Sequence, residues 1–245
     1  MLRRHILCVP RSDAVHRAAQ YLSGIGLPVT YKAAPDISHI LLPVPSFAAG
    51  DGFLAHLLAD VPDNVVISGG FLDRPLLGSY RTIDFLKDPF YLAQNAAITA
   101  SCAITMLKSN TACALKDIRI LIVGWGRIGK CLCRLFEKEG ARVTVAVRKE
   151  ADRAMIQALG CRGISIEDAK QELSHYDAIL NTVPEMVLPE MDTKPDAIIL
   201  ELASRPGMRG ENIIDARGLP GKMAPERSGE LIAKTFIRLS LGKEQ

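Results

Sequence analysis

The chain has 245 residues, of which 48% are hydrophobic and 23% charged, and its formal net charge is +3. This composition is that of an ordinary globular protein, long enough to bury a core without disulfides. The absence of a basic cluster and an aromatic content of 5% argue against nucleic acid as a partner. No apolar run reaches about 18 residues and the first one is short for a signal peptide, so we expect no membrane span and a cytoplasmic protein.

In the first third of the chain, short apolar runs surround one amphipathic segment. A helix is expected over 12–24, capped by Ser12 or Asp13, and the Pro-, Gly- and Ala-rich stretch 43–52 is expected to be a loop. A long helix should start at Pro89 with Asp88 as its N-cap. The predicted strands are 5–10, 28–33, 39–44 and 64–68.

The rest of the chain alternates strands and helices more regularly. The predicted strands are 118–123, 142–147, 162–165, 177–181 and 196–201, and the predicted helices are 127–139, 150–158 and 225–240. This alternation predicts an α/β protein with a Rossmann-type doubly wound parallel sheet and a smaller N-terminal α/β lobe. We expect a first domain over 1–88 on the substrate side and a dinucleotide-binding domain over 89–245, with the helix at 225–240 able to pack back on the first domain.

A G-x-G-x-x-G sequence lies between a predicted strand and a predicted amphipathic helix, the context that dinucleotide binding requires. Its first glycine allows a tight turn, its second a close approach of pyrophosphate, and its third close packing of helix on sheet. The free N–H groups of the helix N-terminus favour phosphate. The expected cofactor-binding residues of this loop are Gly124, Trp125, Gly126, Arg127, Ile128 and Gly129.

The end of the next predicted strand indicates which dinucleotide binds. A ribose-binding acid is expected about 20 residues after the loop, but Val147 stands there, followed by Arg148 and Lys149. An arginine can pair bidentately with a 2′-phosphate, and Glu150 comes too late to bind the ribose. NADP is therefore expected, with NAD the less favoured cofactor; the alternative is that the two basic residues simply start a solvated helix.

Several longer segments resemble the A subunit of dipicolinate synthase, a family of spore-forming bacteria. The glycine loop lies within one of these segments. They follow one another in the family's order, from about residue 40 to the C-terminal helix. They are LLPVPS (41–46), VVISGG (65–70), NAAITA (95–100), ILIVGWGRIG (120–129), VTVAVRK (143–149), ILNTVP (179–184), ELASRPG (201–207) and GLPGKMAPERSGELIA (218–233).

The resemblance implies an oxidoreductase that oxidises a dihydrodipicolinate-type precursor to dipicolinate during sporulation. It also implies a flavoprotein-like second subunit, and most such enzymes are homo-oligomers. The sequence departs from the family in a shorter N-terminal lobe, and in Ser101 and Cys102 where the family has an acidic residue and a glycine. These departures keep open the alternative of a non-catalytic NADP-binding subunit, beside that of a reductase of a small keto or imino acid.

Ligands of doubly wound folds bind outside the carboxyl ends of the strands, where three predicted loops should meet. Arg205 can bind a carboxylate of a dicarboxylate substrate bidentately, and Lys222 can meet the second one. Ser46 ends a strand of the first lobe and is expected to contact cofactor or substrate, and Thr99 is a weaker catalytic candidate. The loop expected at the nicotinamide comprises Asn181, Thr182, Val183 and Pro184.

The sequence does not reveal the acid or base of the reaction. No histidine stands where a hydroxyacid dehydrogenase needs one, and nothing in their spacing distinguishes Asp36, Asp51 or Asp84. The cysteines are scattered among apolar neighbours. The spacing of Cys131 and Cys133 places them on different sides of a helix, so we expect buried thiols and no metal site.

Overall fold

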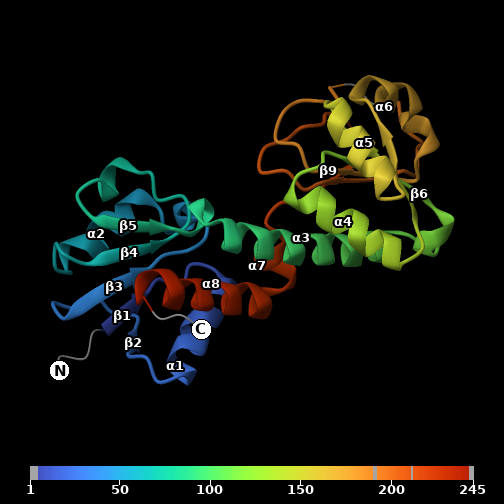
Figure 1. Cartoon of the computed structure of the whole chain (residues 1–245). Helices are drawn as coiled ribbons and strands as arrows, with labels where there is room; N and C mark the ends of the chain where they lie inside the picture. The colour runs from blue at the N-terminus through green and yellow to red at the C-terminus, as the bar shows by residue number, and fades with distance from the viewer. Residues whose placement is uncertain (1–4, 190–191, 211, 243–245) are drawn as a thin grey trace. The chain divides into compact units, whose positions relative to one another are not determined.

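The computed structural model describes residues 5–189, 192–210 and 212–242. The chain forms two compact units (Figure 1). The first comprises the residues up to Asn95 together with those from Pro220 onward, and the second runs from Ala96 to Leu219.

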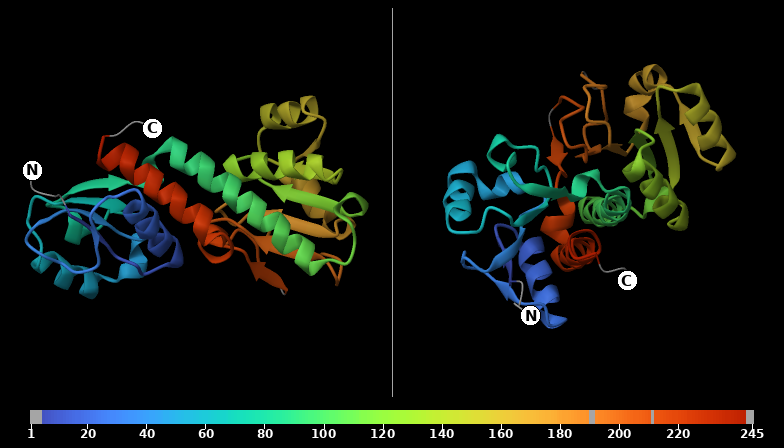
Figure 2. Two further views of the ribbon diagram at one scale, coloured as in Figure 1. Left: turned by 90° about the horizontal axis from the view of Figure 1, so that it is seen from below. Right: turned by 60° about the vertical axis from the view of Figure 1, so that its left-hand side comes forward.

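The first unit is built on a parallel sheet with strand order β2-β1-β3-β4-β5. Helix α2 covers one sheet face, where Leu54 and Leu58 join the core, and helices α1 and α8 pack together on the other (Figure 2). The strands are β1 His5–Cys8, β2 Val29–Thr30, β3 Ile37–Leu41, β4 Val66–Gly69 and β5 Arg81–Asp84; the helices are α1 Asp13–Gly24, α2 Asp51–Ala59, α7 Leu219–Met223 and α8 Pro225–Ser240.

Helix α8 is fixed to this sheet by polar as well as apolar contacts. The ring of His39 lies edge-on to Phe236 and its Nε2 is 3.3 Å from the carbonyl oxygen of Ser240. The hydroxyl groups of Ser68 and Ser240 are 2.7 Å apart. The sequence prediction placed this helix in the dinucleotide-binding domain with the option of packing back; in the structure it packs on α1 and belongs to the first unit.

The second unit contains a six-stranded parallel sheet with order β11-β10-β9-β6-β7-β8. Renumbered from β6, this is the 3-2-1-4-5-6 order of the doubly wound dinucleotide-binding fold, with its switch point between β6 and β9. The predicted fold class is therefore confirmed. The strands are β6 Arg119–Val123, β7 Arg142–Ala146, β8 Arg162–Ile164, β9 Ala178–Asn181, β10 Ile198–Glu201 and β11 Ile213–Asp215; the helices are α4 Arg127–Lys138, α5 Glu150–Ala158 and α6 Ile166–Glu172.

Helix α3, Pro89–Asn110, runs from the first unit into the second. As predicted, it begins at a proline, and the Asp88 carboxylate accepts the N–H of Tyr91 at 2.7 Å. Its length and apolarity alone would suit a membrane span, yet half of that stretch is buried inside the protein. A core helix of a globular protein has the same properties.

Several elements were not predicted. Helix α2 starts in the stretch that we expected to be a loop, and helix α6 begins with a capping box between Ser165 and Asp168. Strands β5 and β11 and helix α7 were also missed. Short elements such as these carry few apolar residues each, so periodicity does not identify them. The 3-10 helices in the described residues are η1 Ser46–Ala49, η2 Pro75–Leu77, η3 Phe85–Lys87, η4 Leu115–Asp117 and η5 Leu173–His175.

Candidate dinucleotide site

The glycine loop follows β6 and has the geometry that each glycine was expected to serve. Gly124 has a φ of +103°, and a Cβ there would lie 2.5 Å from Thr182 Oγ1. A Cβ on Gly129 would lie 2.3 Å from the carbonyl oxygen of Gly124, so helix α4 packs directly on the turn. At Gly126, by contrast, a Cβ would meet nothing within 4 Å. Only this middle glycine faces open space, as a phosphate-binding position requires.

Helix α4 starts directly at this open position. Gly126 is its N-cap and has no side chain to satisfy the first N–H groups, which leaves them free for an anion. Arg127 is exposed beside them, and Trp125 is half-buried with Lys130 Nζ 5.8 Å from its ring centre. The helix packs on the sheet through the buried residues Gly129, Leu132 and Phe136, and Ile128 at its start is half-buried.

A cavity of about 220 Å³ adjoins the loop. The exposed residues Arg148 and Lys149 follow β7 at its rim, and Asp152 also lines it. The Arg148 guanidinium donates to Glu185 Oε2 at 3.0 Å, with both side chains more than half exposed. Glu185 is a residue that the sequence reasoning missed, and it places a carboxylate beside the arginine expected to bind a 2′-phosphate.

The loop after β9 is fixed by a buried polar network. Asn181 is fully buried, and its Nδ2 donates to Val183 O at 3.0 Å and to Glu201 Oε1 at 2.8 Å. The Thr182 hydroxyl donates to Val123 O at 2.8 Å, at the end of β6. Val183 lines the cavity, and Pro184 is exposed beside it. The loop expected at the nicotinamide thus adjoins the glycine turn, but its Asn181 amide is committed to protein partners.

Glu201 holds the next loop as well. Its carboxylate accepts the N–H groups of Ala203 at 3.1 Å and Gly207 at 2.8 Å. A Cβ on Gly207 would lie 2.4 Å from Val183 O and 2.5 Å from Asn181 Nδ2, so this loop packs against the preceding one. Sequence reasoning missed Glu201, although an acid directly after the buried run AIIL was the signal that could have revealed it.

The remaining predicted residues lie as follows within their own units. Arg205 is exposed in the loop held by Glu201, and Thr99 is buried on α3. Lys222 is exposed on α7, where we had expected a loop. Ser46 is fully buried at the start of η1; its hydroxyl donates to Phe71 O at 2.8 Å and its carbonyl oxygen accepts from Arg74. Its side chain therefore supports a turn of the first unit.

Within the described residues, no group of three histidine, cysteine, aspartate or glutamate side chains could hold a metal ion. None of the six cysteines, all of which lie in the described part of the chain, forms a disulfide. Cys133 interacts with Cys161 rather than with Cys131, and burial raises its pKa to about 12.

The strand order and the glycine loop define a protein with a Rossmann-type, dehydrogenase-like fold. Comparison with known proteins identifies its family. The chain is 30% identical over 233 residues to the A subunit of dipicolinate synthase from Bacillus subtilis (strain 168), an alignment that covers 83% of this chain and 77% of the relative. The chain therefore belongs to the family of dipicolinate synthase A subunits, as its motifs predicted. No family model matches it.

Solved structures agree with this assignment at the level of the fold. The A subunit of dipicolinate synthase from Bacillus halodurans superposes with a TM-score of 0.80 at 22% identity, covering 97% of this chain and 98% of that one. The A chain of dipicolinate synthase from Bacillus subtilis superposes with a TM-score of 0.78 at 20% identity, and the match covers 99% of this chain and 97% of that one. A transhydrogenase from Sinorhizobium meliloti superposes with a TM-score of 0.72 at 14% identity, and the match covers 96% of this chain and 93% of that one.

Proposed function

We propose that this chain is an NADP-dependent oxidoreductase subunit that oxidises a dihydrodipicolinate-type precursor to dipicolinate during sporulation. Membership of the family supports this activity. The proposal includes a cytoplasmic location, a homo-oligomeric state and a flavoprotein-like second subunit.

The open position at Gly126 carries the proposal, because Gly124 before it is crowded by the side chains of Thr182 and Val183 and Gly129 after it by the Gly124 carbonyl oxygen. It leaves room for a pyrophosphate at the N-terminus of α4, where free N–H groups and the helix dipole stabilise negative charge. The residues present therefore fit a dinucleotide. When bound there, a nicotinamide would supply the acceptor for the hydride that the substrate loses.

The choice of NADP depends on Arg148 and Lys149 at the cavity rim. The pair between Arg148 and Glu185 is exposed, so it stabilises the fold by about 0–1 kcal/mol. A 2′-phosphate with nearly two negative charges can replace one carboxylate as the partner of this guanidinium. Glu185 opposes that exchange by repulsion, which makes it the residue that tunes the preference between the two dinucleotides.

For the substrate, we propose that Arg205 binds one carboxylate through its planar fork of donors. The loop that carries it is held by Glu201, which limits the conformational freedom that binding would otherwise cost. Lys222 and Thr99 remain candidates for the second carboxylate and for catalysis. Asn181 and Glu201 position the neighbouring loops.

One observation favours a second candidate, a non-catalytic NADP-binding subunit. The Ser101 hydroxyl donates to Ala97 O at 3.0 Å along its own helix, and Cys102 is buried. Neither residue offers the carboxylate that the resemblance implies for this part of α3. A chain that lacks this acid can bind dinucleotide and still depend on a partner for turnover.

The test is a titration of the purified chain with NADPH and NADH, followed by addition of enzymatically generated dihydrodipicolinate precursor with NADP. Tight NADPH binding and new dipicolinate absorbance are expected. Binding without turnover, also after addition of the flavoprotein-like subunit, would support the non-catalytic alternative. Turnover only with small keto or imino acids would instead indicate a reductase, and failure to bind either dinucleotide would contradict the proposal.

A further inference from the structure

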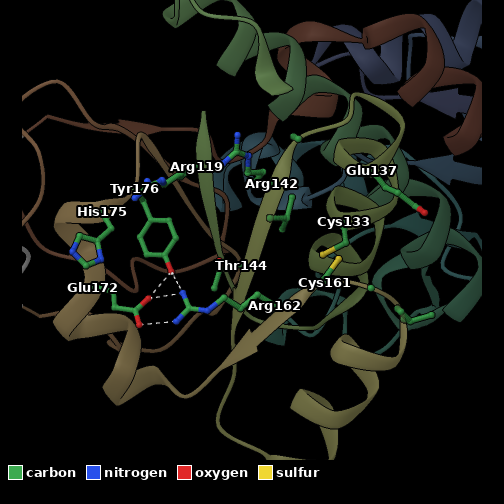
Figure 3. Close-up of a pocket in the computed structure, with 14 residues that line it drawn as sticks. Arg119, Cys133, Glu137, Arg142, Thr144, Cys161, Arg162, Glu172, His175 and Tyr176 are labelled. Carbon is green, nitrogen blue, oxygen red and sulfur yellow. Dashed lines mark hydrogen bonds and ion pairs between the residues drawn. The ribbon is translucent and has the colours of Figure 1, made fainter. Parts of the chain in front are cut away.

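A hollow of about 720 Å³ opens in the second unit at the amino ends of β6, β7 and β8 (Figure 3). The glycine loop follows the carboxyl end of β6, so the two features lie at opposite edges of one parallel sheet. The volume is within the range of about 300–1,000 Å³ that is usual for small-molecule sites. This hollow plays no part in the proposed dinucleotide site.

Each of the three strands begins with an arginine that lines the hollow, Arg119, Arg142 and Arg162. Arg119 and Arg142 are register partners, so their side chains leave the same sheet face from strands about 4.8 Å apart. Arg162 pairs in register with Thr144, two residues beyond Arg142, and therefore leaves that face too. The parallel register gathers three guanidinium groups on one face.

The three arginines differ in how they are neutralised. Arg162 donates to both carboxylate oxygens of Glu172, at 2.6 and 2.7 Å, and to the Tyr176 hydroxyl at 3.3 Å (Figure 3). Arg119 and Arg142 form no ion pair within the described chain. The Asp177 carboxylate accepts the backbone N–H of Arg119 and pairs with Lys194, and it also attracts the charge of Arg119 without forming an ion pair with it.

Like charges placed opposite each other on adjacent strands repel. Among the acids that line the hollow, Glu172 is paired with Arg162 and Glu137 with Arg134. A bound anion would relieve the repulsion between Arg119 and Arg142, and their planar forks match phosphate and carboxylate. Val143 and Leu159 supply apolar wall for a carbon skeleton.

We propose that this hollow is a second binding site for a small molecule with at least two phosphate or carboxylate groups. Arg119 and Arg142 bind the anionic groups, and Arg162, held by Glu172, forms a rigid wall. Cys133 and Glu137 of α4 also line the hollow, on the sheet face opposite to the three arginines, so an occupant that extends round the amino ends of the strands touches the helix that starts at the glycine loop.

The thiols of Cys133 and Cys161 face each other in this hollow, opposite the Arg162–Glu172 pair (Figure 3). Cys161 is partly exposed, whereas Cys113 is exposed and does not line the hollow. Alkylation of Cys161 therefore reports occupancy at the site itself, with Cys113 as an internal control. Burial raises the pKa of the Cys161 thiol, so labelling is done at pH 9.

The experiment measures iodoacetamide labelling of both cysteines by mass spectrometry, with pyrophosphate, citrate or chloride at equal ionic strength. Slowing of Cys161 labelling by at least threefold in one of the two polyanions, with Cys113 unchanged, is expected. Protection by pyrophosphate alone indicates a phosphate ester, and protection by citrate alone a polycarboxylate. The Arg119→Gln/Arg142→Gln variant should lose the protection, whereas Lys32→Gln/Arg217→Gln, at residues that do not line the hollow, should keep it.

Pyrophosphate can also bind the glycine loop, so the same labelling is repeated with the Gly126→Ala variant. Retained protection there separates the hollow from the dinucleotide site, and failure of one proposal then leaves the other standing. Both arginines are exposed, so the double variant should fold, which circular dichroism verifies. An unchanged Cys161 rate in both polyanions, or equal protection in the double variant, would overturn the proposal.

Discussion

The amide of Asn181 donates to the carboxylate of Glu201 at 2.8 Å, between residues that are register partners at the ends of β9 and β10. Glu201 also accepts two backbone N–H groups, so one buried carboxylate holds the ends of two strands and both following loops. The first of these loops is the one expected at the nicotinamide, and the second carries Arg205, which we propose to bind the substrate.

Replacing Glu201 by Ala should destabilise the protein by about 3 kcal/mol, because three buried donors would lose their acceptor. Urea denaturation measures the change. The matched control is Asp215→Ala, the exposed register partner of Glu201 on β11, for which a loss below about 0.5 kcal/mol is expected. Equal losses in the two variants would show that the network contributes little.

Gly126 and Gly129 should respond to alanine in opposite ways. Gly126→Ala should fold normally, since its Cβ meets nothing within 4 Å, and lose dinucleotide binding at least tenfold. Gly129→Ala should lower the melting temperature, because its Cβ would lie 2.3 Å from the Gly124 carbonyl oxygen. Thermal denaturation and NADPH titration distinguish the two effects. Undiminished binding in a folded Gly126→Ala variant would argue against pyrophosphate at this position.

The cofactor preference should follow the charges at the cavity rim. Arg148→Asp should weaken the binding of NADPH about 10–100-fold and change the affinity for NADH little, since a hydrogen bond to a charged group contributes about 1.5–3 kcal/mol. Glu185→Gln should raise the affinity for NADPH about two- to fivefold, because it frees Arg148 from an exposed ion pair. Fluorescence titration measures both. If Glu185→Gln instead weakens NADH, Glu185 binds the ribose and NAD is the cofactor.

Arg205→Ala should weaken substrate use and leave dinucleotide affinity intact. The loss in kcat/KM should be about 10–100-fold, as expected for a lost bond to a carboxylate. Arg209→Ala, at an exposed arginine four residues further on, is the matched control and should behave like the parent protein. Normal turnover by Arg205→Ala would exclude this arginine from substrate binding.

Glu172 links stability to pH. The hydrogen bonds from Arg162 lower the pKa of Glu172 in the folded protein below its ordinary value of 4.5. A carboxyl whose pKa is depressed by folding stabilises the protein above its unfolded pKa and loses this effect as the pH falls through its folded pKa. Glu172→Gln should therefore cost about 0.5–1 kcal/mol at pH 7 and less at pH 2.5. Urea denaturation at the two pH values measures the difference, and a pH-independent cost would mean that the charge is not responsible.

The sequence by itself determined the α/β class, the family and the glycine loop, because these depend on local patterns. The strand before Gly124, the helix after Gly129 and the strand that ends at Val147 are each visible in a few consecutive residues. For the helix at 225–240 the sequence left two positions open, in the dinucleotide-binding domain or packed back on the first domain, since an amphipathic helix does not indicate which surface covers its apolar face.

The tertiary structure alone decided which distant side chains meet. Glu201 reaches Asn181 because β9 and β10 are paired, and Arg148 meets Glu185 across 37 residues of sequence. In the sequence, Arg119 and Arg142 are 23 residues apart, and each simply begins a strand. Only the parallel register places them side by side. Local periodicity reports which face of an element is buried, whereas strand order and register determine its neighbours.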